Sequence, residues 1–249
     1  MVHLLPLPGA PRWTGDLDGM LAAASRDAER LLEGGCDALL VENMGDNPWL
    51  KGRVDPWTVA AMTRAVERVV ALGVPTGVQV LAGANLEALG IAAVTGASFV
   101  RVEGFAYAHV ADEGWIDACA GELLRARAML GADVAVWADV QKKHSAHAVT
   151  GDLTLEDLAH GTAFAGADVL IATGTSTGVA TDPAHVAAMK TAGVPVAVGS
   201  GVTPENAGQL GFADALIVGS WLKEDGDWRR PVDTERVARL RNAMRAAVR

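Results

Sequence analysis

The segment Pro195-Val196-Ala197-Val198-Gly199-Ser200-Gly201-Val202-Thr203-Pro204 contains the pattern that decides the fold. Its β-branched and apolar run, Pro195–Gly199, predicts a strand. Small residues follow, and Thr203-Pro204 then supplies a polar cap and a proline, which is typical of a helix start. The segment therefore predicts a strand that passes through a tight turn into a helix, which is the unit of a parallel sheet.

The same pattern recurs along the whole chain. Apolar runs predict eight strands at Val2–Leu7, Ala38–Asn43, Thr76–Leu81, Phe99–Glu103, Val134–Val140, Val169–Thr173, Pro195–Gly199 and Ala215–Gly219. The runs are continuous rather than alternately apolar and polar, as expected of strands in a sheet that helices cover. Amphipathic stretches predict helices at Asp18–Glu33, Pro56–Leu72, Asn85–Thr95, Gly114–Leu130, Thr154–Ala165, Pro183–Thr191, Pro204–Leu210 and Asp233–Val248.

Eight strands alternating with eight helices in 249 residues predict an α/β fold, the (β/α)8 or TIM barrel. No linker or low-complexity tract divides the chain, so we expect a single barrel domain over residues 1–249. An open doubly wound sheet is the alternative. It normally has a glycine-rich fingerprint after the first strand, where this chain has Pro6-Leu7-Pro8-Gly9-Ala10-Pro11.

Composition narrows the class of protein. Half of the residues are hydrophobic, and 30 acidic residues outnumber 21 basic ones, giving a net charge of −9. This balance disfavours nonspecific nucleic-acid binding, which needs a basic surface. The sequence has neither a signal-peptide pattern nor an apolar run long enough to span a bilayer. We therefore expect a cytoplasmic homo-oligomer without a membrane span, whose partner is a small molecule. Cys36 and Cys119 indicate no disulfide framework and no zinc motif.

The working residues of a TIM barrel lie at the C-terminal ends of the strands and in the loops that follow them. The predicted catalytic residues are Glu42, Asp139, Lys143 and His144. The predicted substrate- and phosphate-binding residues are His3, Asn43, Gln79, Arg101, Glu103, Gly174, Thr175, Ser200, Gly201, Gly219 and Ser220.

The loops after the last two strands give the strongest signal. Barrels often bind phosphate with the loops after strands 7 and 8 and a nearby helix N-terminus. Here Gly199-Ser200-Gly201-Val202-Thr203 precedes the helix expected at Pro204, and Gly219-Ser220 follows the eighth strand. Small residues allow backbone N–H groups to approach an anion, so these loops predict a phosphate site. The competing interpretation is that tight turns need glycine in any case.

Charged residues at the strand ends are the second signal, because burying a charge is unfavourable unless it is paired or used. Arg101 and Glu103 fit either a substrate site or a structural ion pair with each other. Asp139 is followed by Lys142 and Lys143, and a lysine that is partly desolvated beside a carboxylate can act as an acid, base or nucleophile. We expect Lys143 to fold over the barrel mouth and Lys142 to point outward.

Two further patterns carry less weight. His144 and His147 are three residues apart, but without a third ligand at defined spacing they support a divalent metal site only weakly. We predict no metal site and no cofactor. Gly174-Thr175-Ser176-Thr177-Gly178 fits the nucleophile elbow of hydrolases, which also requires an acid and then a histidine well downstream. Only His185 follows, nine residues later, so we interpret the match as accidental.

Several segments together resemble the BtpA/SgcQ family over essentially the whole chain. They are His3–Gly9, Glu42–Pro48, Phe99–Val102, Ala138–Val140 with Lys143-His144, Gly199–Asn206, Ile217–Ser220 with Leu222-Lys223, Asp225-Gly226, and Pro231–Asp233. The resemblance implies a TIM barrel related to ribulose-phosphate-binding barrels. Cyanobacterial members of the family are associated with photosystem I biogenesis, and another member lies among sugar-uptake genes.

The chain departs from that family in one region. After the third strand the family usually has Asn-Val-Leu-Arg-Asn-Asp, where this chain has Gln79-Val80-Leu81-Ala82-Gly83-Ala84, and Glu103 replaces an asparagine. The resemblance therefore implies an altered substrate on a retained anion site, with Gln79, Arg101 and Glu103 at the end of the substrate away from the phosphate.

Two classes of function fit the sequence. The first is an enzyme that acts on a small phosphorylated sugar-like metabolite by acid–base chemistry of the lyase, isomerase or glycosyl-transfer type, with Glu42, Asp139, Lys143 and His144 as its reactive groups. The second is a non-catalytic assembly or regulatory factor on a barrel scaffold, as in photosystem I biogenesis. A factor without catalysis would not need ionisable groups at its strand ends, and this chain has several, so the sequence favours an enzyme.

Overall fold

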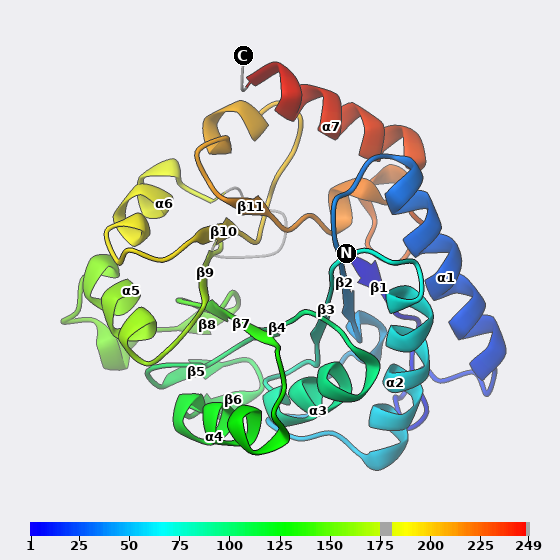
Figure 1. Ribbon diagram of the computed structural model, residues 1–249, viewed down its shortest axis with the longest axis horizontal. Helices are drawn as coiled ribbons and strands as arrows, with labels where there is room; N and C mark the ends of the chain where they lie inside the picture. Colours follow the sequence, from blue (N-terminus) through cyan, green and yellow to red (C-terminus); the bar gives the residue numbers. More distant parts are fainter. Residues whose placement is uncertain (175–180, 248–249) are drawn as a thin grey trace.

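The computed structural model of the protein describes residues 1–174 and 181–247 and contains a curled parallel sheet of eight strands (Figure 1). The strand order is β1-β2-β3-β4-β7-β9-β10-β11, and neighbouring strands are parallel throughout. The strands are β1 (Val2–His3), β2 (Leu39–Glu42), β3 (Thr76–Gln79), β4 (Phe99–Val102), β7 (Ala135–Asp139), β9 (Val169–Ala172), β10 (Val196–Val198) and β11 (Ala215–Leu216). Each of the eight predicted strands is confirmed, as is the (β/α)8 class.

Helices surround the sheet and cover its outer face (Figure 1). They are α1 (Leu17–Glu33), α2 (Pro56–Val70), α3 (Asn85–Thr95), α4 (Ala120–Leu130), α5 (Leu155–Phe164), α6 (Pro183–Lys190) and α7 (Thr234–Ala247). Local sequence explains their starts. Asp16 and Asp182 accept hydrogen bonds from backbone amides at the starts of α1 and α6, and Thr154 forms a capping box with Asp157 before α5.

Two predicted helices are wrong in part. The stretch Gly114–Leu130 is a short strand, β6 (Gly114–Ile116), followed by α4, because Asp112-Glu113-Gly114 turns the chain back on β5 (His109–Ala111). With β8 (Ser145–Ala146) these strands form a separate antiparallel sheet, β6-β5-β8. The stretch Pro204–Leu210 forms only the 3-10 helix η3 (Ala207–Leu210). The remaining single-turn 3-10 segments are η1 (Met44–Asp46), η2 (Ala148–Thr150), η4 (Ser220–Leu222) and η5 (Glu224–Gly226).

The barrel interior is divided into an apolar floor and a polar mouth. Leu40, Phe99, Ile171, Ala197 and Ile217 pack together inside the sheet, and the Phe99 and Trp137 rings stack with centroids 4.4 Å apart. Gly77 leaves the space that the Phe99 ring occupies, since a Cβ there would overlap the ring. The buried polar side chains lie further along the same strands, at their C-terminal ends.

Register places these polar residues at one level. His3 pairs with Glu42, and Glu42 pairs with Gln79, across β1, β2 and β3. At the junction of the first and last strands, the Met1 ammonium donates to the carbonyl oxygen of Val218 at 2.8 Å. The C-terminal ends of all eight strands therefore meet around one opening, as the parallel arrangement requires.

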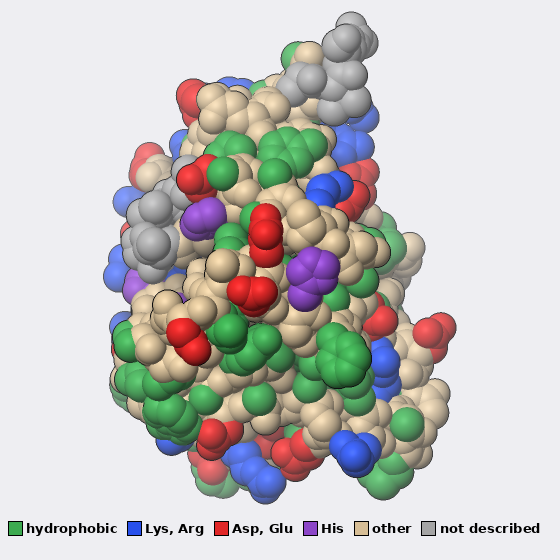
Figure 2. Space-filling view, turned by 90° about the vertical axis from the view of Figure 1, so that its left-hand side faces the viewer, with side chains coloured by type: hydrophobic (Ala, Val, Ile, Leu, Met, Phe, Trp, Pro, Cys, Tyr) green, Lys and Arg blue, Asp and Glu red, His purple; other side chains and the backbone are tan. Residues whose placement is uncertain are grey.

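One face of the molecule reflects the acidic composition. Figure 2 shows one face, on which acidic side chains lie scattered among neutral ones and basic side chains lie mainly toward the edges of the view. Among the described residues, no helix is both long enough and apolar enough to cross a membrane.

Candidate active site

A cavity of about 260 Å³ opens at the C-terminal ends of the strands. We call it the mouth cavity. Eleven of the fifteen predicted site residues line it: His3, Glu42, Gln79, Arg101, Glu103, Lys143, His144, Ser200, Gly201, Gly219 and Ser220. The structure therefore brings together side chains from β1 to β4, the loop after β7, and the two small-residue loops after β10 and β11.

The other four predicted residues lie elsewhere. Asp139 is buried beneath the cavity lining, paired with Arg101. Asn43 is tied to the backbone instead of facing the cavity: its side chain accepts from the Leu81 amide at 2.7 Å and donates to Asp46 at 3.0 Å. Gly174 lies two residues after the end of β9 and does not line the cavity, and Thr175 lies outside the described residues.

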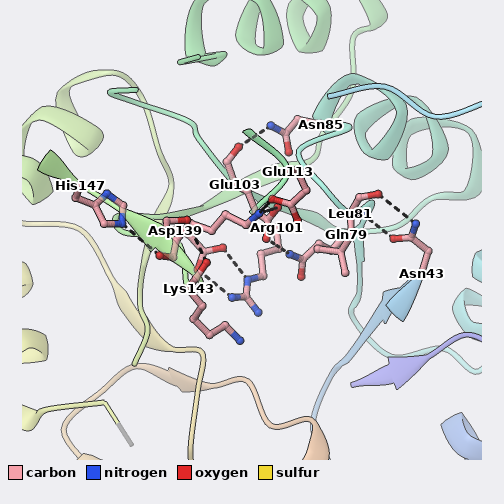
Figure 3. A network of polar contacts seen from close by, with 12 residues as sticks. Asn43, Gln79, Leu81, Asn85, Arg101, Glu103, Glu113, Asp139, Lys143 and His147 are labelled. Carbon is pink, nitrogen blue, oxygen red and sulfur yellow. Dashed lines mark hydrogen bonds and ion pairs between the residues drawn. The ribbon is translucent and has the colours of Figure 1, made fainter. Parts of the chain in front are cut away.

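Arg101 and Asp139 form the central ion pair of the site (Figure 3). The guanidinium donates twice, from Nε to Oδ2 at 3.0 Å and from Nη2 to Oδ1 at 2.9 Å, and both side chains are almost fully buried. Burial opposes the charged guanidinium, but Asp139 outweighs it, so the pKa of Arg101 is raised. The expected pairing of Arg101 with Glu103, and of Asp139 with a lysine, is corrected by this geometry, because the bidentate Arg–carboxylate fork is the stronger contact.

Lys142 points inward, contrary to expectation. Its ammonium lies 2.5 Å from Glu113 Oε2 and 3.7 Å from Glu103 Oε2, and the side chain is only 8% exposed. Burial lowers the pKa of Lys142, but Glu103 and Glu113 more than compensate, so the net shift is upward. Lys142 is therefore a fixed cation. Glu113 was missed by the sequence analysis; the turn Asp112–Gly114 between β-prone residues was the available signal for the hairpin that carries it.

Glu103 has a strongly perturbed carboxyl group. Burial raises its pKa from 4.5 to about 7, with Asp139 adding to the shift and Lys142 and Arg101 opposing it. Its Oε1 accepts a long hydrogen bond of 3.5 Å from Gln79 Nε2. Asn85 holds the backbone by donating to the Glu103 carbonyl oxygen at 2.8 Å. A carboxyl with this pKa exists in both protonation states near neutral pH and can both donate and accept a proton.

Lys143 is the second group suited to proton transfer. Figure 3 shows its side chain beside the Arg101–Asp139 pair, on the side of the pair where the Arg101 guanidinium ends. In the described part of the chain, its ammonium has neither a hydrogen-bond acceptor nor a carboxylate at ion-pair distance. Burial and the nearby Arg101 lower its pKa, while Glu42 and Asp139 oppose the shift. Burial therefore favours the uncharged form of Lys143 relative to an exposed lysine.

His3 and Glu42 face each other across β1 and β2. His3 Nε2 lies 3.6 Å from Glu42 Oε2. Burial lowers the pKa of His3 well below its usual value, with Lys223 and the N-terminal amine adding to the effect, so the ring is neutral at pH 7. Burial also raises the pKa of Glu42, against the influence of Arg101 and Lys143. The contact is therefore not a pair of opposite charges.

The glycines in the loops after β10 and β11 lie directly against the side chains of Arg101 and His3. A Cβ on Gly199 would lie 3.3 Å from Arg101 Nη2, and a Cβ on Gly219 would lie 3.1 Å from His3 Nε2. Gly201 has φ +65, a left-handed conformation that favours glycine. Among the described residues, the amides of Gly201, Gly219 and Ser220 have no hydrogen-bond acceptor, so these donors are available to a ligand.

The expected contribution of a helix N-terminus is absent from this arrangement. The Asn206 side chain bridges two backbone groups of the loop after β10. It accepts a hydrogen bond from the Thr203 amide at 2.8 Å and donates one to the Gly201 carbonyl oxygen at 2.7 Å. The Thr203 amide is thus already occupied, and η3 is too short for an appreciable dipole. Asn206 fixes the shape of the turn instead.

His144 lies at the rim of the cavity, exposed, with φ +54. The Nε2 of His147 lies 3.2 Å from the Lys142 carbonyl oxygen, so His147 packs on the backbone of this loop. Within residues 1–174 and 181–247, no three His, Cys, Asp or Glu side chains are grouped so that they could hold a metal ion.

The fold and the mouth cavity define a (β/α)8 barrel with reactive side chains on one side of its opening and bare loops on the other. The particular family follows from sequence: the chain belongs to the BtpA family, whose pattern matches residues 1–246.

Relatives of known sequence support the same assignment. The chain is 40% identical over 248 residues to an uncharacterized mitochondrial protein of Caenorhabditis elegans, covering 96% of this chain and 90% of that protein. It is 39% identical over 251 residues to the photosystem I biogenesis protein BtpA of Synechocystis, covering 98% of this chain and 86% of the relative.

Solved structures show the same fold at low identity. Phosphoribosyl anthranilate isomerase from Thermus thermophilus matches with a TM-score of 0.59 and 17% identity, covering 90% of this chain and 95% of that one. Orotidine 5'-monophosphate decarboxylase from Methanocaldococcus jannaschii matches with a TM-score of 0.54 and 15% identity, covering 97% and 100%.

Proposed function

We propose that the protein is an enzyme that acts on a small phosphorylated sugar-like metabolite by acid–base chemistry in the mouth cavity. The reaction is an isomerisation, a lyase-type cleavage or a glycosyl-type transfer. Two solved barrels of the same fold act on phosphorylated ribosyl compounds, as their names state, which agrees with this substrate class.

The observation that carries the proposal is the juxtaposition of two titratable groups with shifted pKa values in one cavity. Glu103 has a pKa of about 7, and the pKa of Lys143 is lowered by burial and by Arg101. General acid–base catalysis works best with groups that titrate near the operating pH. Glu103 serves as a proton donor or acceptor, and Lys143 as the partner base or, when charged, as the stabiliser of a developing oxyanion.

The remaining predicted residues take positioning and binding roles. Asp139 holds the Arg101 guanidinium in place, and Glu42 with His3 forms the wall next to Gly219. The phosphate group lies against the free amides of Gly201, Gly219 and Ser220, while Gln79 and Glu103 meet the other end of the substrate. His144 contacts the substrate from the rim. A cavity of about 260 Å³ suits a compact sugar phosphate.

The test is proton exchange on a bound ligand. A panel of pentose and hexose phosphates is screened by thermal shift, with the corresponding free sugars as controls. Compounds that raise the melting temperature are incubated with the protein in D2O and followed by proton NMR. We expect loss of a carbon-bound proton signal, or appearance of a product, for a phosphorylated compound only. Binding without exchange or turnover across the panel would contradict the proposal.

A non-catalytic assembly factor is the second candidate. The name of the Synechocystis relative, a photosystem I biogenesis protein, favours it. In that case the mouth cavity would bind a ligand as a signal, and the same panel would give thermal stabilisation without chemical change. The NMR experiment therefore separates the two candidates.

Self-association is a further part of the proposal. Phe164, Met129 and Val94, on α5, α4 and α3, are 95%, 81% and 75% exposed, respectively. Large apolar side chains exposed to this degree are typical of interaction surfaces. They support the predicted homo-oligomer, which light scattering of the purified protein would check. Cytoplasmic location stays a prediction.

A further inference from the structure

A second cavity, of about 600 Å³, lies between the loop after β1, helix α1 and the segment after η5. Figure 1 shows the orange segment after β11 beside α1. The lining includes five arginines: Arg12, Arg26, Arg30, Arg229 and Arg230. The chain has only 21 basic residues and a net charge of −9, so this gathering of positive charge is local and against the overall balance.

Nearby carboxylates offset only part of the positive charge of this arginine cavity. Asp27, which also lines it, lies 2.6 Å from the Lys223 ammonium and accepts from the Val232 amide at 2.9 Å. Arg229 and Arg230 pair with Asp227 and Asp225 in exposed contacts, which contribute little.

Three of the arginines lack a carboxylate partner among the described residues. Within the described residues, Arg12, Arg26 and Arg30 have no carboxylate at ion-pair distance. Arg12 and Arg30 each donate to a backbone carbonyl oxygen, of Gly45 at 3.4 Å and Val232 at 3.0 Å, which fixes them without removing their charge. Arg26 and Arg30 lie one turn apart on α1, so they present the same side of the helix.

His3 connects this cavity to the mouth cavity, because its side chain lines both. That side chain is 6% exposed and lies against the backbone of Trp228, which also lines the arginine cavity.

We propose that the arginine cavity is a second anion site, for a ligand that carries a diphosphate or two neighbouring phosphate groups. Arginine guanidinium groups match phosphate oxygens with paired N–H donors, and several arginines from different elements suit more than one phosphate. The volume exceeds what a single phosphate needs. The site is separate from the substrate-phosphate loops of the mouth cavity and does not depend on the function proposed for them.

The experiment measures the binding of inorganic pyrophosphate by isothermal titration calorimetry in about 0.15 M salt, where the Debye length is about 8 Å. It is done in a Ser220→Asp background, in which the mouth loops carry a repelling carboxylate. We expect binding to persist in that background and to weaken about tenfold or more when Arg26→Glu is added. Arg26→Gln is the milder variant and should show a smaller loss in the same direction. Arg26 is exposed and makes no ion pair, so neither change should disturb folding.

Arg68→Glu, on the exposed face of α2, is the matched control for a change in net charge. It should leave pyrophosphate binding within about twofold of the background protein, because exposed charges at a distance are screened. Absence of binding in the Ser220→Asp protein, or an equal loss in Arg26→Glu and Arg68→Glu, would overturn the second anion site.

Discussion

The two sides of the barrel mouth are built differently. The side formed by β2, β3, β4 and β7 carries five buried polar residues: Glu42, Gln79, Arg101, Glu103 and Asp139. The side formed by the loops after β10 and β11 carries glycine and serine, with backbone amides as its donors. The first can change protonation state, and the second cannot.

This difference teaches how one opening can serve two tasks. Buried charges shift each other's pKa values and need partners, as Arg101 and Asp139 show. Backbone amides hold an anion without charge and remain fixed at every pH. Separating the two lets the reactive side be tuned without altering the anion side, and the predictions below perturb one side at a time.

Lys143→Met gives the largest expected effect. The substitution keeps the apolar stem and removes the ammonium, so turnover should fall about a thousandfold, within the range of a positioned acid–base group. Stability should change little, because Lys143 makes no ion pair with the described residues. Steady-state kinetics measures the turnover number on a substrate identified by the NMR screen. Lys190→Met on α6 is the control. Near-normal activity in Lys143→Met would remove this lysine from the mechanism.

Arg101→Met tests the buried pair at the centre of the reactive side. It leaves the Asp139 carboxylate buried without its partner, so the free energy of unfolding should fall by about 3–5 kcal/mol. Arg241→Met is the matched control, because Arg241 also grips a carboxylate with two donors, that of Asp37, but this carboxylate is 75% exposed. Urea denaturation should show a loss below about 1 kcal/mol for the control. Similar losses in the two variants would contradict the role of burial.

Glu103→Gln sharpens the pH dependence. The folded pKa of about 7 lies above the ordinary 4.5, so between these values the folded protein binds more protons than the unfolded chain. Stability contributed by the neutral carboxyl is fully present below pH 4.5 and is lost as the pH rises through 7. Glutamine stays neutral at every pH. Between pH 4.5 and 8, the free energy of unfolding of the variant should therefore rise relative to that of the wild type by on the order of 3 kcal/mol.

The measurement for Glu103 is urea denaturation at both ends of that pH range. Glu67→Gln, on the exposed face of α2, should show no such pH-dependent gain. A stability difference between wild type and Glu103→Gln that is the same at pH 4.5 and pH 8 would refute the raised pKa.

Ser220→Asp perturbs the small-residue side and has the smallest expected effect. A carboxylate beside the free amides should weaken binding of the phosphorylated ligand about 10- to 100-fold, by repulsion and by competition for the donors. Ser220→Ala, which removes only the hydroxyl, should lose much less. Calorimetric titration compares the two. Gly201 is a poorer choice, because its φ of +65 would strain any side chain. Equal affinities in both Ser220 variants would place the anion elsewhere.

Much of the architecture was predictable from the sequence, since each strand is a local apolar run and each helix has a local start or stop. The predicted runs Val169–Thr173 and Pro195–Gly199 contain β9 and β10, which are one and two residues shorter, respectively. The hairpin of β5 and β6 was missed because Gly114–Leu130 also has helical character, and the pairing of β5 with β8 joins segments more than thirty residues apart. The single-domain organisation stays a prediction.

The sequence by itself determined most of the residues that reach the mouth of the barrel, eleven of the fifteen predicted, because parallel strands bring their C-terminal ends to one edge whatever the partners. The sequence could not determine which basic side chain forms an ion pair with which carboxylate. Arg101 pairs with Asp139 rather than Glu103, Lys142 turns inward to Glu113, and Lys143 is left without a carboxylate. Those choices depend on register and burial across distant strands, since a buried ion pair is stable only at short distance and with good geometry. Only the tertiary structure sets both.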